Sequence, residues 1–151
     1  MNIWIDADAC PAEIRDIIIK AAHKRAISAI FVSNKLMAIP ESPYLSFIKV
    51  EQGADVADQY IAENVSSKDL VITQDIPLAA IIVPMGAVVI SFHGDLFTES
   101  NIGERLSVRN FMTELRETGV QTYGPKPFND KIKQKFANTF DQQLVKLMKY
   151  M

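Results

Sequence analysis

The sequence predicts an α/β fold with three layers, α/β/α, around a mainly parallel central sheet. Apolar runs without polar alternation occur at residues 3–5, 29–33 and 70–73. Such runs are typical of short strands that are covered on both faces. Segments with helical periodicity separate these runs, and strands that alternate with helices favour parallel pairing. Both observations lead to the same layered architecture.

The length and composition of the chain fit one domain. Its 151 residues are 48% hydrophobic and 23% charged, which is enough for one well-buried core but too little for two ordinary domains. We therefore expect residues 1–151 to form a single domain. The formal net charge of -2 argues against nucleic-acid binding through overall positive charge, and leaves a local basic patch open.

The sequence also predicts a cytoplasmic protein that does not enter a membrane. Cys10 is the only cysteine, so no intramolecular disulfide can form, which fits a reducing compartment. The apolar stretch at residues 76–90 is shorter than a membrane span and is interrupted by Pro77, Pro84 and Gly86. The first residues lack the basic leader of a signal peptide. The sequence does not indicate an oligomeric state.

The first half of the chain is expected to read strand, helix, strand, strand, helix. Pro11 suits the first turn of a helix, and the residues after it have the spacing of an amphipathic helix. Strands are expected at residues 29–33 and, after a proline-rich loop, at residues 47–50. A helix is expected at residues 55–62.

The second half continues the alternation and ends in two longer helices. After the strand at residues 70–73 we expect a helix at residues 76–83 and a strand at residues 87–91. Residues 118–128 contain two glycines and two prolines and predict a loop. The helix before this loop has an apolar side formed by Leu106, Phe111, Met112 and Leu115. The helix after it begins near Asp130 and is expected to pack through Ile132, Phe136, Phe140, Leu144 and Leu147.

Carboxylates follow two of the predicted strands. Asp6 and Asp8 come after the first strand, and Asp75 follows the strand at residues 70–73. Ligands bind beyond the carboxyl ends of the strands in open α/β sheets, so these side chains should meet there. Asp55 and Asp58 are three residues apart, which places them on one side of a helix start. They are equally compatible with an ordinary acidic first turn.

This acidic group predicts a divalent-metal site. Carboxylates that stay ionised close together generally need a cation between them. Oxygen ligands without clustered histidine or cysteine favour Mg²⁺ or Mn²⁺ over zinc. The candidate ligands are Asp6, Asp8, Asp55, Asp58 and Asp75, with Asp6 and Asp75 as the candidate catalytic residues.

Five further residues are candidates for binding a substrate. Asn34 and Thr73 follow strands and could orient ligands, and strand-end capping explains them equally well. Lys35, Arg105 and Arg109 could contact a phosphate group, although ordinary surface charge is the commoner explanation for such residues. We assign neither Cys10 nor His93 to catalysis, because the sequence offers neither of them a partner.

Four ordered motifs resemble the bacterial YaiI/YqxD family over nearly the whole chain. They are Asp6-Ala7-Asp8-Ala9-Cys10-Pro11, Gly53-Ala54-Asp55-Val56-Ala57-Asp58, Val71-Ile72-Thr73-Gln74-Asp75-Ile76-Pro77-Leu78-Ala79, and Asn101-Ile102-Gly103-Glu104-Arg105-Leu106 with the later Gly124-Pro125. The resemblance implies a PIN-like fold, whose relatives include metal-dependent ribonucleases with acidic sites. On that comparison Asp6 ends the first strand, Asp75 belongs to the Thr-x-Asp segment, and Asp55 or Asp58 is the intervening acidic residue.

This chain departs from the family pattern at one place. Phe92-His93-Gly94 stands where many members carry Pro-Arg-Gly. The resemblance would otherwise imply a phosphate contact by an arginine, and His93 does not supply one.

Three functions are compatible with these residues. The first is a divalent-metal-dependent nuclease that hydrolyses phosphodiester bonds, with RNA favoured over other nucleic acids. The second is a haloacid-dehalogenase-like phosphatase with Asp6 as nucleophile, although Cys10 stands where that signature wants threonine. The third is a non-catalytic PIN-like module that binds a metal or RNA.

Overall fold

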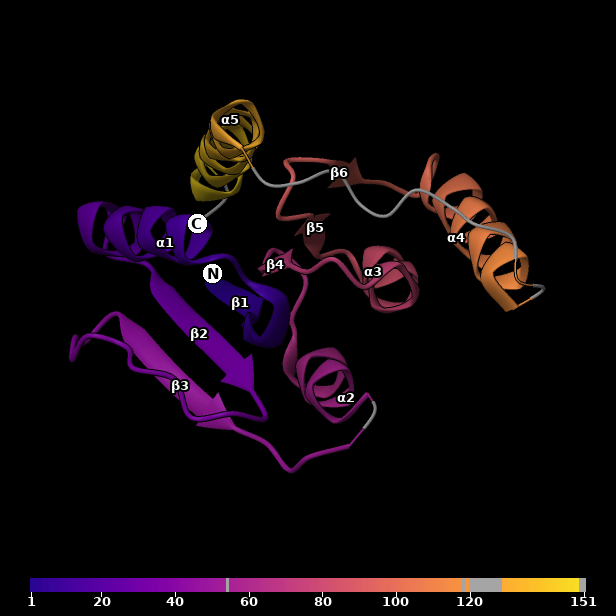
Figure 1. The fold of residues 1–151 in the computed structure, drawn as a ribbon. Coiled ribbons are helices and arrows are strands. Elements are labelled where there is room, and N and C mark those ends of the chain that lie inside the picture. The colour runs from indigo at the N-terminus through magenta and orange to yellow at the C-terminus, as the bar shows by residue number, and fades with distance from the viewer. Residues whose placement is uncertain (54, 118, 120–128, 150–151) are drawn as a thin grey trace.

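The computed structural model describes residues 1–53, 55–117, 119 and 129–149, and its centre is one six-stranded sheet. The strands lie in the order β3-β2-β1-β4-β5-β6 (Figure 1). All neighbouring pairs are parallel except β5 and β6. The strands are β1 (Asn2–Asp6), β2 (Ser28–Ser33), β3 (Leu45–Lys49), β4 (Leu70–Ile72), β5 (Val88–Ile90) and β6 (Leu96–Phe97).

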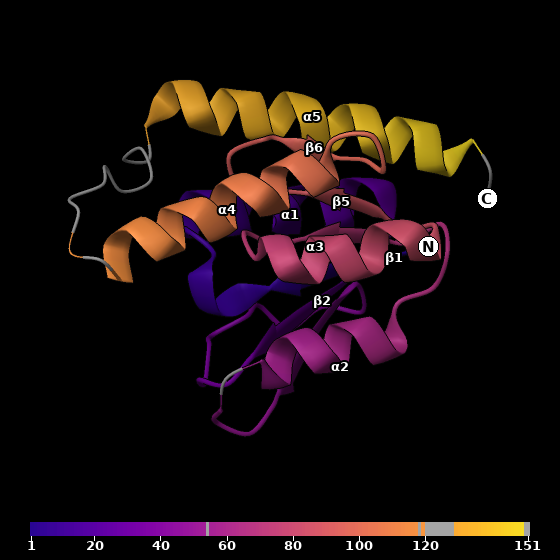
Figure 2. The same ribbon diagram turned by 90° about the vertical axis from the view of Figure 1, so that its right-hand side faces the viewer.

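Helices cover both faces of the sheet, so the predicted three-layer α/β/α fold is confirmed. The helices are α1 (Ala12–Arg25), α2 (Val56–Asn64), α3 (Ile76–Ile82), α4 (Ile102–Glu117) and α5 (Asp130–Met148), with 3₁₀ turns at Ala7–Ala9 and Val83–Met85. Helices α1 and α5 lie on one face and α2 and α3 on the other, while α4 packs against α3 (Figures 1 and 2). None of the described helices is both long and apolar enough to cross a membrane.

The core lies on both sides of β1. Successive side chains of a strand point to opposite faces of the sheet. Ile3 and Ile5 therefore pack in the cluster that contains α1 and α5, while Trp4 belongs to the cluster that contains α2 and α3. All three side chains are buried. This double burial explains why the run at residues 3–5 shows no polar alternation.

A buried carboxylate fixes β1 against β4 at the amino ends of the two strands. Asp69 is 4% exposed. It accepts hydrogen bonds from the backbone N–H of Asn2 at 2.9 Å, from Nε1 of Trp4 at 3.0 Å and from the backbone N–H of Ser66 at 2.9 Å. These bonds satisfy a charge that would otherwise be costly to bury. They also hold the register that brings the carboxyl ends of the two strands together.

The boundaries of several elements differ from those predicted. Strand β3 begins at Leu45 and ends at Lys49, two and one residues earlier than expected. The short antiparallel strand β6 was not predicted, because two residues carry too little pattern to be recognised. Helix α2 begins at Val56, since Asp55 has a left-handed backbone with φ 66°. The predicted loop at residues 118–128 lies outside the described residues, except for Gly119.

Helix α4 has the predicted apolar side, and that side is only partly covered: Leu106, Met112 and Leu115 are half-buried. No residue of this helix is buried, and Phe111 is 58% exposed. Helix α4 contacts α3 rather than the sheet, so only part of its surface is covered. Periodicity identifies which side of a helix is apolar, but it does not identify what covers that side.

Candidate metal centre

Two strand ends bring Asp6 and Asp75 to the same edge of the sheet. Asp6 is the last residue of β1, and Thr73 follows the last residue of the neighbouring parallel strand β4. The Thr73 hydroxyl donates a hydrogen bond to Oδ2 of Asp6 at 3.0 Å and accepts one from the backbone N–H of Asp75 at 3.0 Å. Thr73 is fully buried, so it forms a fixed link between Asp6 and the start of α3.

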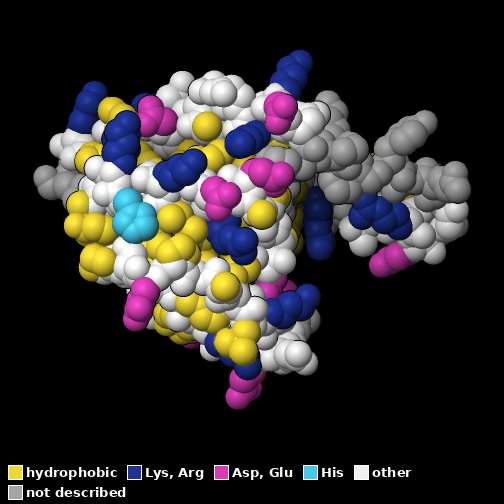
Figure 3. All heavy atoms as spheres, turned by 60° about the vertical axis from the view of Figure 1, so that its left-hand side comes forward, with side chains coloured by type: hydrophobic (Ala, Val, Ile, Leu, Met, Phe, Trp, Pro, Cys, Tyr) yellow, Lys and Arg dark blue, Asp and Glu magenta, His cyan; other side chains and the backbone are white. Residues whose placement is uncertain are grey.

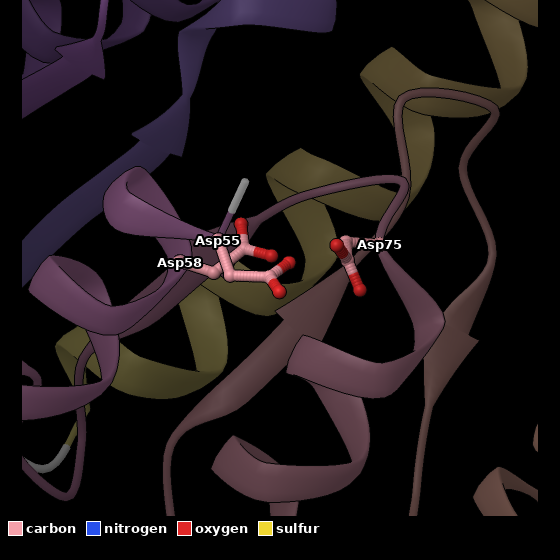
Figure 4. Close-up of side chains that lie close together, drawn as sticks. All are labelled: Asp55, Asp58 and Asp75. Carbon is pink, nitrogen blue, oxygen red and sulfur yellow. The ribbon is translucent and has the colours of Figure 1, made fainter. Parts of the chain in front are cut away.

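Three carboxylates converge where α2 and α3 begin. Asp55 precedes α2, Asp58 lies in its first turn, and Asp75 precedes α3. One carboxylate oxygen of each lies within 4.8 Å of one from each of the other two. In Figure 4 the side chains of Asp55 and Asp58 extend toward that of Asp75. We call this group the acidic triad.

Helix capping explains the position of Asp75 but not that of Asp55. Oδ1 of Asp75 accepts a hydrogen bond from the backbone N–H of Leu78 at 2.9 Å, so Asp75 also caps α3. Asp55 is a non-glycine residue at φ 66° and makes no side-chain capping bond. Asparagine and aspartate adopt this left-handed region more readily than most residues. Capping of α2 therefore does not account for the position of the Asp55 carboxylate.

Burial, together with the crowding of like charges, changes the protonation of Asp58. Its pKa rises from the ordinary 3.8 to about 8. Burial is the largest cause, followed by a hydrogen bond to Asp75 and the charges of Asp75, Asp6 and Asp55. Among the described residues, the ion pairs are Arg25–Asp141, Arg105–Asp95 and Lys135–Asp95. The acidic triad forms none of them, so a bound proton must relieve its repulsion in the absence of a cation.

Asp6 is not a member of the triad, but its charge acts on the triad. Burial raises the pKa of its carboxyl group, the Thr73 hydrogen bond opposes that rise, and the charges of Asp8 and Asp75 add to it. Asp6 does not line the pocket that contains the triad. It therefore lies next to the triad, on the side nearer the middle of the sheet.

Asp8 is hydrogen-bonded to the end of β2 and is not a member of the triad. Its Oδ1 accepts a short hydrogen bond from the Ser33 hydroxyl and a bond of 3.2 Å from the backbone N–H of Asn34. Both donors belong to the end of β2 and the turn after it. The structure thus groups Asp8 with β2, whereas it groups Asp55, Asp58 and Asp75 with one another.

The predicted substrate contacts are spread over the same edge of the sheet. Asn34 lines a second pocket of about 380 Å³ together with Lys49, Val50, Glu51 and Gln52. Lys35 is exposed, and its backbone N–H bonds to the Ser33 hydroxyl. Arg105 is drawn toward Asp95, with its Nη1 3.9 Å from the carboxylate. Of the three basic candidates, only Arg109 lines the pocket with the triad.

The pocket that holds the triad has an apolar wall that the sequence analysis missed. Its volume is about 450 Å³. A usable signal was present in α3, whose residues Ile-Pro-Leu-Ala-Ala-Ile-Ile are apolar on every side. A helix of this kind has more apolar surface than one sheet can cover. The pocket is lined by Asp55, Asp58, Gln59, Ala62, Asp75, Pro77, Leu78, Ile81 and Arg109.

The surroundings of Cys10 and His93 indicate structural roles rather than catalytic ones. Burial raises the pKa of the Cys10 thiol to about 12, and the thiolate is the nucleophilic form of cysteine. The backbone N–H of His93 bonds to the Ser91 hydroxyl at 3.2 Å in the turn before β6. Neither residue lines the triad pocket.

The protonated triad predicts a pH-dependent stability for the metal-free protein. The folded state holds a proton on Asp58 that the unfolded chain releases near pH 4, so its contribution is greatest below that pH. The contribution is lost as the pH rises to about 8. We expect Asp58→Asn to match the wild type at low pH and to be more stable than it above pH 8.

Urea unfolding in EDTA at a series of pH values measures this difference. The relevant quantity is the wild-type free energy of unfolding minus that of the Asp58→Asn variant, since other titrating groups then cancel. A difference that stays constant with pH would show that Asp58 does not hold the proton.

The fold and this site define a class: a three-layer α/β/α domain with an acidic pocket at the carboxyl edge of a mainly parallel sheet. Comparison with known proteins makes the assignment narrower. Residues 4–146 match the model of the family described as "Uncharacterized BCR, YaiI/YqxD family", and the chain belongs to this family.

Full-length relatives agree with this assignment. UPF0178 proteins are 50% identical in Syntrophobacter fumaroxidans and 49% identical in Myxococcus xanthus, each over 99% of this chain and 97% of the relative. A UPF0178 protein of Shewanella baltica is 48% identical over 97% of both chains. No solved structure matches the chain.

Proposed function

We propose that this chain is a divalent-metal-dependent nuclease of PIN-like fold that hydrolyses phosphodiester bonds, with RNA as the favoured substrate. The observation that carries the proposal is the convergence of Asp55, Asp58 and Asp75 in a pocket that also holds Arg109. Carboxylates suit a divalent cation, and a guanidinium group suits a phosphate. A cytoplasmic location, inferred from the lone cysteine, is part of the same proposal.

The donor set of the triad fits Mg²⁺ or Mn²⁺. All three side chains offer carboxylate oxygens, which are the hard ligands that these ions prefer. Asp55, Asp58 and Asp75 would hold the ion, and Asp6 would add negative charge from the adjacent strand end. A bound divalent cation supplies phosphate neutralisation and activation of water for in-line attack. Asp8, bonded to Ser33 and Asn34, is the weakest of the proposed ligands.

The protein's own residues would position the substrate around this charge. Arg109 projects from α4 into the pocket and would bind a phosphate oxygen. Thr73 holds Asp6 and the Asp75 backbone in fixed positions, so both carboxylates are ready before a substrate arrives. Asn34 and Lys35 lie beyond Asp8 at the end of β2 and would contact the chain farther along. Arg105 has an acidic neighbour and is the weaker of the two arginine candidates.

The side of the molecule that carries α1 has a mixed surface charge. The face in Figure 3 carries lysines and arginines interspersed with acidic side chains. On α1, Arg25 forms an ion pair with Asp141 of α5. A mixed surface of this kind attracts a phosphate backbone less than a basic stripe would.

The two alternatives make different demands on Asp6. A haloacid-dehalogenase-like phosphatase would need Asp6 itself as the nucleophile in the substrate pocket, and Asp6 does not line the pocket that holds the triad. A PIN-like module that binds metal or RNA without catalysis would need only the pocket. We therefore favour the nuclease, in which Asp6 acts by its charge and position.

The test is cleavage of a single-stranded oligoribonucleotide with Mn²⁺ or with EDTA. We expect cleavage with Mn²⁺ only, and a loss of at least about tenfold in Asp6→Asn, because removing even an outer partner of a metal site costs about 10–100-fold. Asp16→Asn, an exposed aspartate of α1, is the matched control. A phosphoaspartate at Asp6 would select the phosphatase, and binding without cleavage would select the module.

A further inference from the structure

The triad pocket has a second half that a metal site alone does not need. Ala62 of α2 and Pro77, Leu78 and Ile81 of α3 line it beside the carboxylates. Leu78 is buried, whereas Ile81 is 58% exposed. An isoleucine that stays exposed at a pocket wall leaves apolar surface available for a ligand.

Helix α3 is apolar all round, and neighbouring elements cover most of its apolar surface. Leu78, Ala79 and Ile82 pack in the core cluster on this face of the sheet. Helices α2 and α4 also contact α3. Ile81 is the large side chain of α3 that this packing leaves exposed, and it lines the same pocket as the triad.

The remaining pocket residues define what kind of ligand fits. Gln59 provides an amide that can both donate and accept hydrogen bonds, and Arg109 provides a guanidinium group for an anion. The ligand must therefore have a flat or compact apolar part, hydrogen-bonding edges and a nearby negative charge. A pocket of about 450 Å³ is within the range of about 300–1,000 Å³ for small-ligand sites.

We infer that the apolar half of this pocket binds one nucleobase of a single-stranded nucleic acid, next to the phosphate held at the acidic triad. The base lies against Ile81 and Pro77, with its edge toward Gln59, while Arg109 contacts the backbone phosphate. This assignment rests on the proposed function for the identity of the ligand. It adds that the base beside the bound phosphate must be unstacked from its neighbours, so a duplex does not fit.

Binding measured without turnover tests the inference separately from catalysis. The probe is a fluorescein-labelled oligoribonucleotide whose anisotropy is followed with Ca²⁺ in place of Mn²⁺. A matched series of oligonucleotides each lacks the base at one position. The variant is Ile81→Ser, and the control is Val145→Ser, which changes an exposed residue of α5 on the opposite face of the sheet.

We expect Ile81→Ser to raise the Kd for the intact oligonucleotide about tenfold, as loss of about 1.4 kcal/mol would, and Val145→Ser to leave it unchanged. One abasic oligonucleotide should bind as weakly as the variant does, and Ile81→Ser should not weaken it further, because both changes remove the same contact. Additive losses, an unaffected Kd or no binding at all would overturn the base site. If the two losses are not additive but no cleavage occurs with Mn²⁺, the base site would be upheld and the nuclease rejected.

Discussion

Replacing Asp75 by asparagine is expected to weaken Mn²⁺ binding by at least about tenfold, because loss of even an outer partner of a metal site costs that much. The substitution removes one of the three converging charges. It leaves α3 intact, since asparagine caps a helix about as well as aspartate does and can still accept the bond from Leu78. The metal-free variant should be at least as stable as the wild type, because repulsion in the triad is relieved.

Isothermal titration calorimetry with Mn²⁺ measures the affinity, and urea unfolding in EDTA measures the stability. Asp16→Asn removes an exposed carboxylate from α1 and should change neither quantity. Asp69 would be a poor control despite its distance from the triad, because three hydrogen bonds depend on its carboxylate. Equal Mn²⁺ affinity in Asp75→Asn and the wild type would reject the triad as the metal site.

The Phe140→Ala substitution should lower the free energy of unfolding by about 3–5 kcal/mol, the usual cost of removing a fully buried phenyl ring. Phe140 is 2% exposed and belongs to the core cluster between α1, α5 and the sheet. Its ring stacks on that of Phe136 with centroids 5.3 Å apart. The alanine variant would leave a cavity that this rigid layer can fill only in part.

Urea unfolding of Phe140→Ala and Val145→Ala, both on α5, gives the comparison. Val145 is 39% exposed, so its truncation should change stability by no more than about 0.5 kcal/mol. Mn²⁺ affinity should be the same in both variants at a temperature where both are folded, since α5 covers the face opposite the triad. A loss in Phe140→Ala as small as that in Val145→Ala would mean that α5 is not docked on the sheet.

The sequence predicted those elements whose apolar residues show directly which faces are buried. The parallel strands were found as apolar runs without polar alternation, and the helices α1 and α5 were found because their apolar residues recur at helical spacing. Burial of Phe136 and Phe140 followed from the same spacing. At α4 the spacing identified the apolar side but not how far it is covered: Leu106, Met112 and Leu115 are half-buried, whereas Phe111 is 58% exposed. Periodicity does not show which neighbour is present.

The candidate site was predicted less completely than the fold. Topology correctly brought Asp6 and Asp75 to one edge, because their strands are parallel neighbours. Spacing alone could not show that Asp58 would join Asp55 and Asp75, nor that Asp8 would turn toward Ser33. Those outcomes depend on side-chain directions at the ends of strands, where the backbone leaves the regular geometry. The apolar pocket wall formed by α3 could not be predicted either, because it is the part of the helix that stays uncovered after the other residues of the helix have packed.

The most direct test of the metal centre is anomalous diffraction from a crystal soaked in Mn²⁺. The account predicts an anomalous peak within coordination distance of the carboxylates of Asp55, Asp58 and Asp75, and no such peak in an Asp75→Asn crystal soaked in the same way. Fully ordered carboxylates with no manganese between them, or manganese bound only elsewhere on the protein, would contradict it.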